Sequence, residues 1–210
     1  IVLDVTSSVG SGVGAVVANV GGAFLGPNGA TPFLSTYPSS NNVNVAGNQV
    51  RANLKNDQTY SITANINFAL TDVAIVSGYS SSYGDGGKAI IDGGTSGASY
   101  NLFSYNASAE NSRCEYIIFQ NNGATGSDAG VSSSANSVTL FQCVIHDVRG
   151  RGLTGSLRIT CVECETYNCN QSNTASTGAF HNTGAATFLR CIAHDNSGSN
   201  TNGFHSSGGA

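Results

Sequence analysis

The sequence predicts an all-β protein, a right-handed parallel β-helix with an irregular N-terminal segment. Three observations lead to this fold class. Apolar residues rarely recur at helical spacing, because Gly, Ser and Asn interrupt every candidate helix. Short stretches instead alternate apolar and polar residues, as half-buried strands do. Several of these stretches superpose on one another, as the coils of a solenoid would.

The repeat is clearest where a cysteine recurs at one position. The matching stretches are "TLFQCVIHD" (139–147), "TCVECETYN" (160–168) and "TFLRCIAHD" (187–195), with "RCEYIIFQN" (113–121) as a looser fourth. The steps are 21 residues from Cys143 to Cys164 and 27 residues from Cys164 to Cys191. Each stretch is followed by a second short one. We therefore expect two strand columns per coil, the second containing Val131, Leu153, Phe180 and Phe204.

Stacking the coils predicts which side chains are buried. Coils about 4.8 Å apart pair each strand with the strands above and below and enclose one core. The column of Ile118, Val144, Glu165 and Ile192 is expected to face solvent because it contains a glutamate. Three columns are expected to face inward: Cys114, Leu140, Cys161 and Phe188; Ile117, Cys143, Cys164 and Cys191; and Phe119, Ile145, Thr166 and Ala193.

The first coils are less regular than the later ones. Residues 58–70 and 72–94 carry apolar residues at every second position, and the latter stretch has Gly-rich turns at 84–87 and 92–94 that supply positive φ angles. We predict that residues 49–210 form the β-helix and that residues 1–48 cap it or link it to a preceding segment. At the far end we expect further coils or a capping partner, because an uncovered coil exposes strand N–H and C=O groups.

The composition excludes several function classes. Charged residues make up only 10% of the chain, and eight Lys and Arg with a net charge of -4 argue against nucleic-acid binding. The longest small and apolar run is interrupted by Gly and is shorter than the ~20 residues of a membrane helix, so no membrane span is predicted. A neutral surface rich in hydroxyl and amide groups suits sugars or close protein packing.

The strings "VGGAFLGPNGA" (20–30) and "GYSSSYGDGGKAIIDGG" (78–94), followed by Asn-rich coils, resemble right-handed parallel β-helix repeat proteins of the pectate-lyase-like superfamily. The similarity is strongest to a subgroup frequent among phage virion proteins and bacterial surface proteins. It extends over roughly residues 20–210. The resemblance implies the solenoid fold but no single activity, because this fold carries lyases, hydrolases, tailspikes and inert stalks.

The cysteines are interpreted as a structural core stack of Cys143, Cys164 and Cys191, joined by Cys114 and Cys161. Free cysteine is among the residue types most often buried. Two alternatives stay open: disulfides between neighbouring coils, which the coil spacing permits, and a metal cluster around Cys161, Cys164 and Cys169.

The histidines are predicted to form two ladders. His181 and His205 should stack and face outward, and His146 and His194 should share a column with Tyr167 between them. A solvated ladder of polar aromatic side chains is the simplest interpretation. The best functional alternative is contact with glycans, by stacking against sugar faces; metal binding or proton transfer is a further one.

In polysaccharide lyases that resemble this fold, clustered acids hold Ca²⁺ and an Arg or Lys removes a proton. Here the comparable column is Asn121, Asp147, Asn168 and Asp195, whose two carboxylates lie two coils, ~10 Å, apart. Arg149 and Arg151 are the nearest bases. Glu163 and Arg190 are expected to form an ion pair between coils.

The sequence therefore predicts a non-catalytic structural protein of a virion or extracellular surface, in contact with glycans. Phe141, Val162 and Leu189 form an apolar stripe suited to packing in a homo-oligomer or against other structural proteins. No cofactor is expected. The alternative is a secreted polysaccharide lyase or glycoside hydrolase, and Ca²⁺ would belong only to the lyase.

Overall fold

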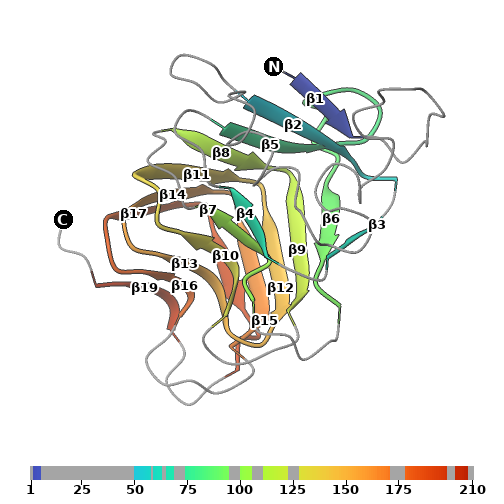
Figure 1. The fold of residues 1–210 in the computed structure, drawn as a ribbon. Helices are drawn as coiled ribbons and strands as arrows, with labels where there is room; N and C mark the ends of the chain where they lie inside the picture. Colours follow the sequence, from blue (N-terminus) through green and yellow to red (C-terminus); the bar gives the residue numbers. More distant parts are fainter. Residues whose placement is uncertain are drawn as a thin grey trace.

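The computed structural model of the chain is a parallel β-solenoid, which confirms the predicted fold class (Figure 1). The structure describes residues 2–5, 50–57, 59–62, 65–68, 74–94, 100–105, 111–122, 128–170, 178–197 and 202–207. This part of the chain contains strands, turns and bends but no helix. None of it could therefore cross a membrane as an apolar helix.

Three parallel sheets make the walls of the solenoid, and from β2 onward each successive described strand joins the next sheet. Sheet A contains β1 (Val2–Val5), β2 (Val50–Lys55), β5 (Ala74–Tyr79), β8 (Ser112–Glu115), β11 (Ser137–Phe141), β14 (Arg158–Val162) and β17 (Ala186–Leu189). Sheet B contains β3 (Thr59–Ser61), β6 (Ala89–Asp92), β9 (Ile117–Asn122), β12 (Val144–Val148), β15 (Glu165–Cys169) and β18 (Ile192–His194). Sheet C contains β4 (Ile66–Phe68), β7 (Phe103–Tyr105), β10 (Ala129–Ser133), β13 (Arg151–Gly155), β16 (Gly178–Asn182) and β19 (Asn202–Ser206).

Each coil has three strands, so the expectation of two was wrong. The repeated stretch read as one strand is two strands joined at a corner: β11 ends at Phe141, and β12 begins at Val144. Between them Gln142 has a φ of 50°. The corner preserves much of the apolar–polar alternation, which is why the sequence pattern concealed it.

Two columns of residues with left-handed backbone make the turns of the coils. One contains Asn and Asp, which tolerate this conformation: Asn121, Asp147, Asn168 and Asp195, with φ between 49° and 57°. The other, at the corner between sheets A and B, contains Tyr116, Gln142, Glu163 and Arg190, with φ between 50° and 55°. The backbone N–H groups of Tyr116, Gln142 and Glu163 donate to carbonyls of the following coil at 2.8–3.0 Å. Bonds between coils thus stabilise a conformation that is unfavourable for these larger residues.

The predicted columns agree with the strand register. Leu140 pairs with Cys114 and Cys161, and Ile145 pairs with Phe119 and Thr166. The side chains of these residues are fully buried. The second predicted column, now assigned to sheet C, pairs Val131 with Leu153, Leu153 with Phe180, and Phe180 with Phe204.

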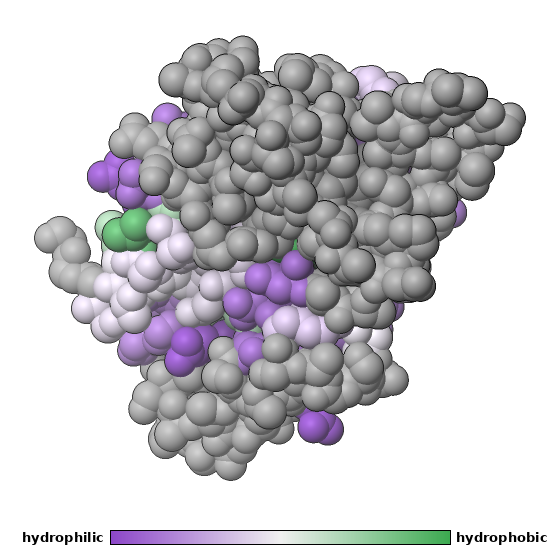
Figure 2. All heavy atoms as spheres, in the orientation of Figure 1, coloured by the Kyte–Doolittle hydropathy of each residue, from purple (hydrophilic) through white to green (hydrophobic). Residues whose placement is uncertain are grey.

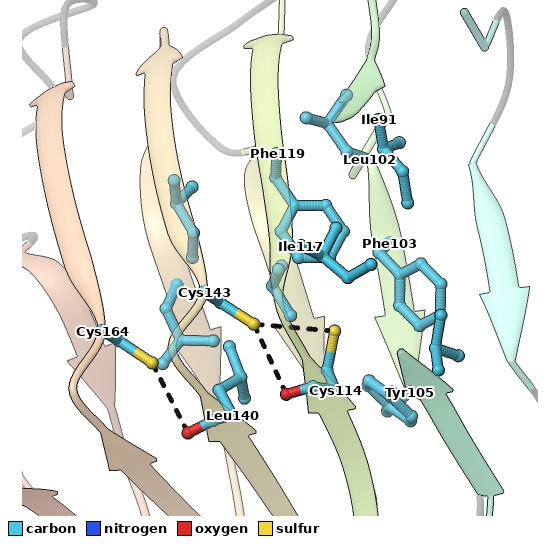
Figure 3. Close-up of a cluster of buried hydrophobic side chains, with 14 of the residues drawn as sticks. Ile91, Leu102, Phe103, Tyr105, Cys114, Ile117, Phe119, Leu140, Cys143 and Cys164 are labelled. Atoms are coloured by element: carbon cyan, nitrogen blue, oxygen red, sulfur yellow. Dashed lines mark hydrogen bonds between the residues drawn. The ribbon is translucent and has the colours of Figure 1, made fainter. Parts of the chain in front are cut away.

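Five of the six cysteines are buried in the core and Cys191 is partly buried. The thiols of Cys143, Cys164 and Cys191, beside the corner between sheets A and B, donate to backbone carbonyls of sheet A, as Figure 3 shows for the first two. Cys143 Sγ lies 3.4 Å from the Cys114 carbonyl oxygen, and Cys164 Sγ lies 3.5 Å from that of Leu140. Cys191 repeats the contact with the Cys161 carbonyl at 3.4 Å. Burial raises the pKa of Cys143, so its thiol keeps the proton that it donates. All six cysteines are free thiols.

The two ends of the described solenoid differ. At the first coil, β1 pairs with β2, so at least this part of the predicted N-terminal segment extends sheet A. The remainder of residues 1–48 lies outside the described residues, and its role as cap or linker stays a prediction. At the last coil, Phe188, Cys191 and Ala193 are only partly buried, while Phe204 is 41% exposed. Their columns have a neighbouring coil on one side only within the described residues.

Thr166 provides a test of the inward columns. Its side chain is fully buried, and its hydroxyl has no hydrogen-bond partner. We predict that Thr166→Val raises the free energy of unfolding by about 1 kcal/mol, because it removes a buried polar group that lacks a partner while keeping the shape. Urea unfolding measures the change. The control is Thr160→Val on the outward side of β14, which should leave stability nearly unchanged; a destabilised Thr166→Val would show that the column is misplaced.

Candidate functional site

The outward face of sheet B carries a ladder of aromatic side chains. His146 on β12, Tyr167 on β15 and His194 on β18 are partners in the strand register. The rings of His146 and Tyr167 lie 4.6 Å apart at an angle of 4°, and those of Tyr167 and His194 lie 5.3 Å apart at 17°. The predicted column is therefore present, and its three rings are stacked.

Carboxylates and an amide hold the ladder in place. Asp147 Oδ2 lies 2.7 Å from His146 Nδ1, and the Asn168 amide donates to the other oxygen of Asp147. At the C-terminal end of the ladder, His194 Nδ1 lies 2.8 Å from Asp195 Oδ2, and its Nε2 lies 2.9 Å from Glu165 Oε1. The two imidazoles are thus oriented by acids from the adjacent columns.

The acids also change the proton affinity of the ladder. Contact with Glu165, and then with Asp195, raises the pKa of His194 above its ordinary value. Partial burial, followed by the charges of Asp147 and Glu165, raises the pKa of Tyr167. His194 thereby keeps its proton to higher pH, and the Tyr167 hydroxyl remains a donor.

The stacking limits what the ladder can contact. Because the rings cover one another face to face, a ligand beside the sheet meets their N–H and O–H edges. Sugar stacking on the ring faces, the mode expected from the sequence, is therefore disfavoured for Tyr167 between its two neighbours. The His194 side chain is 41% exposed and the His146 side chain is 14% exposed, so the ladder is most accessible at its C-terminal end, at His194.

The second ladder is also stacked, but it is more buried than predicted. His181 on β16 and His205 on β19 lie 4.8 Å apart with rings 6° from parallel. His181 alternates with the inward Phe180 and pairs with Thr154, so it lies in the outward column as expected, but it is only 7% exposed and therefore is not a solvated side chain. Burial, then the charges of Arg151 and His205, lowers the pKa of His181 to about 4. The buried Nδ1 of His181 and the buried Nε of Arg151 both lack a hydrogen-bond partner.

Other sequence predictions fall at the corner between sheets A and B. Arg190 Nε lies 2.9 Å from Glu163 Oε1, which confirms the predicted ion pair, and Gln142 Nε2 donates to the other oxygen of Glu163 at 2.7 Å.

The predicted apolar stripe lies in sheet A, where Phe141, Val162 and Leu189 are register partners. Phe141 and Val162 are half-buried and Leu189 is 48% exposed, so the apolar stripe is partly accessible.

Sequence reasoning missed the part that Glu165 plays in the ladder. It placed this residue correctly in an outward column, but the contact with His194 joins two columns and two coils. The available signal was spacing: Glu165 and Tyr167 are two residues apart on one strand and so share its outward face.

On the face that Figure 2 draws, the described residues are mostly hydrophilic, with one small hydrophobic patch.

Within the described residues, no group of three or more His, Cys, Asp or Glu side chains is arranged to hold a metal ion. The cysteines accordingly form no metal cluster there. Comparisons with protein-family models, curated proteins and solved structures found no match. The coil geometry and the side chains themselves are therefore the basis for a functional proposal.

The contact between Glu165 and His194 predicts a pH-dependent stability. Because the pKa of His194 is raised in the folded protein, its stabilising contribution is complete below about pH 6.5, provided Glu165 is ionised, and is lost as pH rises through the raised pKa. Glu165→Gln should lower the His194 pKa, as measured by NMR titration. It should also reduce stability at mildly acidic pH but not at alkaline pH.

The matched control is Glu163→Gln, which removes a carboxylate that contacts Arg190 and Gln142. The control should leave the His194 titration unchanged. Equal shifts of the His194 pKa in both variants would mean that the Glu165 contact is not the cause.

Proposed function

We propose that the protein is a non-catalytic structural β-solenoid of a virion or extracellular surface, and that the sheet B ladder contacts glycans. The observation that carries the proposal is the ordered row of hydrogen-bonding edges of His146, Tyr167 and His194 on three successive coils. These edges are oriented by acids and need little reordering when a ligand binds, which favours affinity. A row that repeats from coil to coil suits a ligand that also repeats.

The charges favour a neutral glycan. Asp147, Glu165 and Asp195 all lie beside the ladder, and their negative charge would repel a polyuronate. A neutral sugar can donate its hydroxyl groups to these carboxylates and accept from the Tyr167 hydroxyl, whereas both nitrogens of His194 already contact Asp195 and Glu165. The low charge content of the whole chain, 10%, is consistent with such a ligand.

The apolar stripe supports the structural part of the proposal. Val162 and Leu189 project from neighbouring strands of sheet A with partial exposure. We infer that this flank packs against a second copy of the chain, because a parallel sheet with a repeating apolar column can match the same column on a copy. Phe141 contributes less, since its ring already packs edge-on against Tyr116 at 5.4 Å.

The alternative remains a polysaccharide lyase or glycoside hydrolase of the pectate-lyase-like type. One observation favours it: His194 lies between two carboxylates, an arrangement that can transfer protons. The superfamily resemblance of the glycine-rich stretches points the same way. The acidic character of the ladder, however, is unfavourable for a uronate substrate, and a lyase would need Ca²⁺ to offset it.

Tyr167→Phe tests recognition by the ring edges. The hydroxyl of Tyr167 would be lost while the stacked ring remains, so we predict that affinity for a neutral oligosaccharide falls about fivefold, the value of one hydrogen bond, with unchanged thermal stability. Binding is measured by calorimetry after a glycan array has identified the oligosaccharide. Tyr116→Phe, at the corner outside the ladder, is the control.

Two results would contradict this interpretation. If Tyr167→Phe binds as well as the wild type, the ladder does not recognise glycans through its edges. If the protein depolymerises polysaccharides in an assay with and without Ca²⁺, and His194→Gln abolishes that reaction, the enzyme alternative replaces the structural one.

The packing stripe predicts a concentration-dependent dimer or higher oligomer. Val162→Lys places a charge in the centre of the stripe and should shift the protein to the monomer in sedimentation velocity experiments. Ser132→Lys, on the outward side of sheet C, should leave the oligomer intact. A wild-type protein that stays monomeric at high concentration would exclude assembly through this flank.

A further inference from the structure

One corner of the solenoid is enlarged. In later coils the chain passes from sheet A to sheet B in one or two residues, as at Tyr116 and at Gln142 and Cys143. Between β5 and β6 the same corner contains residues 80–88. In repeat proteins, insertions within one repeat form loops on the surface and often carry the binding site.

The inserted loop is ordered by one acid. The Asp85 carboxylate accepts from the backbone N–H groups of Ser80 at 2.9 Å, Ser81 at 2.7 Å, Ser82 at 3.0 Å and Gly87 at 3.0 Å. These bonds hold the pKa of Asp85 well below its ordinary range. The loop therefore has a defined shape although it is exposed, and it requires little ordering when a ligand binds.

A pocket of about 400 Å³ lies between this loop and the end of β2, lined by Lys55, Tyr79, Ser81, Ser82 and Tyr83. This volume lies within the usual range for small-ligand sites. Tyr79 is 5% exposed and supports Tyr83 in an edge-to-face contact, with ring centroids 4.8 Å apart at 72°. Tyr83 itself is 55% exposed. An exposed aromatic ring is thus held in position at the pocket.

The charges around the pocket are already balanced. Lys55 Nζ lies 3.4 Å from Asp57 Oδ2, and the Asp85 carboxylate is occupied by backbone donors. An acidic ligand would have to compete with Asp57 for Lys55. A neutral ligand can instead accept from the ammonium group while leaving the ion pair in place.

We propose that this pocket binds one uncharged sugar residue. Its C–H face packs against the exposed ring of Tyr83, and its hydroxyl groups bond to Lys55 and to the hydroxyls of Ser81 and Ser82. A sugar fits both the apolar ring and the surrounding polar groups, which an apolar ligand would leave without partners. The site belongs to an early coil and lies at a corner, whereas the ladder lies on the face of sheet B in later coils, so the site does not rest on the ladder.

The experiment is calorimetric titration with tri- and tetrasaccharides built from glucose, galactose, mannose or N-acetylglucosamine, and with galacturonate and sialyl oligosaccharides as acidic counterparts. At least one neutral oligosaccharide should bind the wild type. Tyr83→Ala should weaken that binding by about tenfold or more, and Tyr83→Phe, which keeps the ring, should bind within about threefold of the wild type. Because Tyr83 is exposed, unchanged urea unfolding will show that both variants fold.

Tyr167→Phe separates this site from the ladder, since it should leave binding at the pocket unchanged. Three results would overturn the proposal: no neutral oligosaccharide binds, only acidic ones bind, or Tyr83→Ala binds as tightly as the wild type. Binding that Tyr83→Ala leaves intact but Tyr167→Phe weakens would belong to the ladder, and the pocket proposal alone would fail. Absence of any neutral ligand would contradict both proposals.

Discussion

Register between stacked coils is the constraint on which the structure depends. Every interior strand of the three sheets pairs with a strand in the preceding coil and one in the following coil, so a residue meets its equivalent in the next coil. Inward columns become a continuous apolar core, as with Leu140 between Cys114 and Cys161. Outward columns become rows of like side chains, and these rows are the surfaces available for recognition.

The corners limit this regularity. A coil closes only if the backbone turns sharply between sheets, and the positive φ angles of Gln142, Glu163 and Arg190 provide that turn. Such conformations are unfavourable for large side chains. The bonds from Gln142 and Arg190 to Glu163, and the thiol contacts with corner carbonyls, offset part of that strain. Cysteine suits the inner side of the corner because it is small and still donates a proton.

Function is proposed where the surface combines order with exposed polar and aromatic side chains. The sheet B ladder obtains order from stacking and from Asp147, Glu165 and Asp195. The loop between β5 and β6 is ordered by Asp85, and this loop interrupts the repeat where the pocket forms. One surface thus uses the repeat and the other departs from it. Both offer neutral sugars a preorganised set of polar groups.

The sequence by itself determined the fold class and the columns, because stacked coils place like residues on like. The row of Cys143, Cys164 and Cys191, the pairing of His181 with His205, and the Glu163–Arg190 contact all followed from counting residues. Only the tertiary structure decided that each coil has three strands, that His181 is buried, that Glu165 reaches His194, and that Tyr83 stands beside a pocket. Periodicity specifies which residues are neighbours along the solenoid, whereas corner angles and side-chain rotamers depend on packing across it.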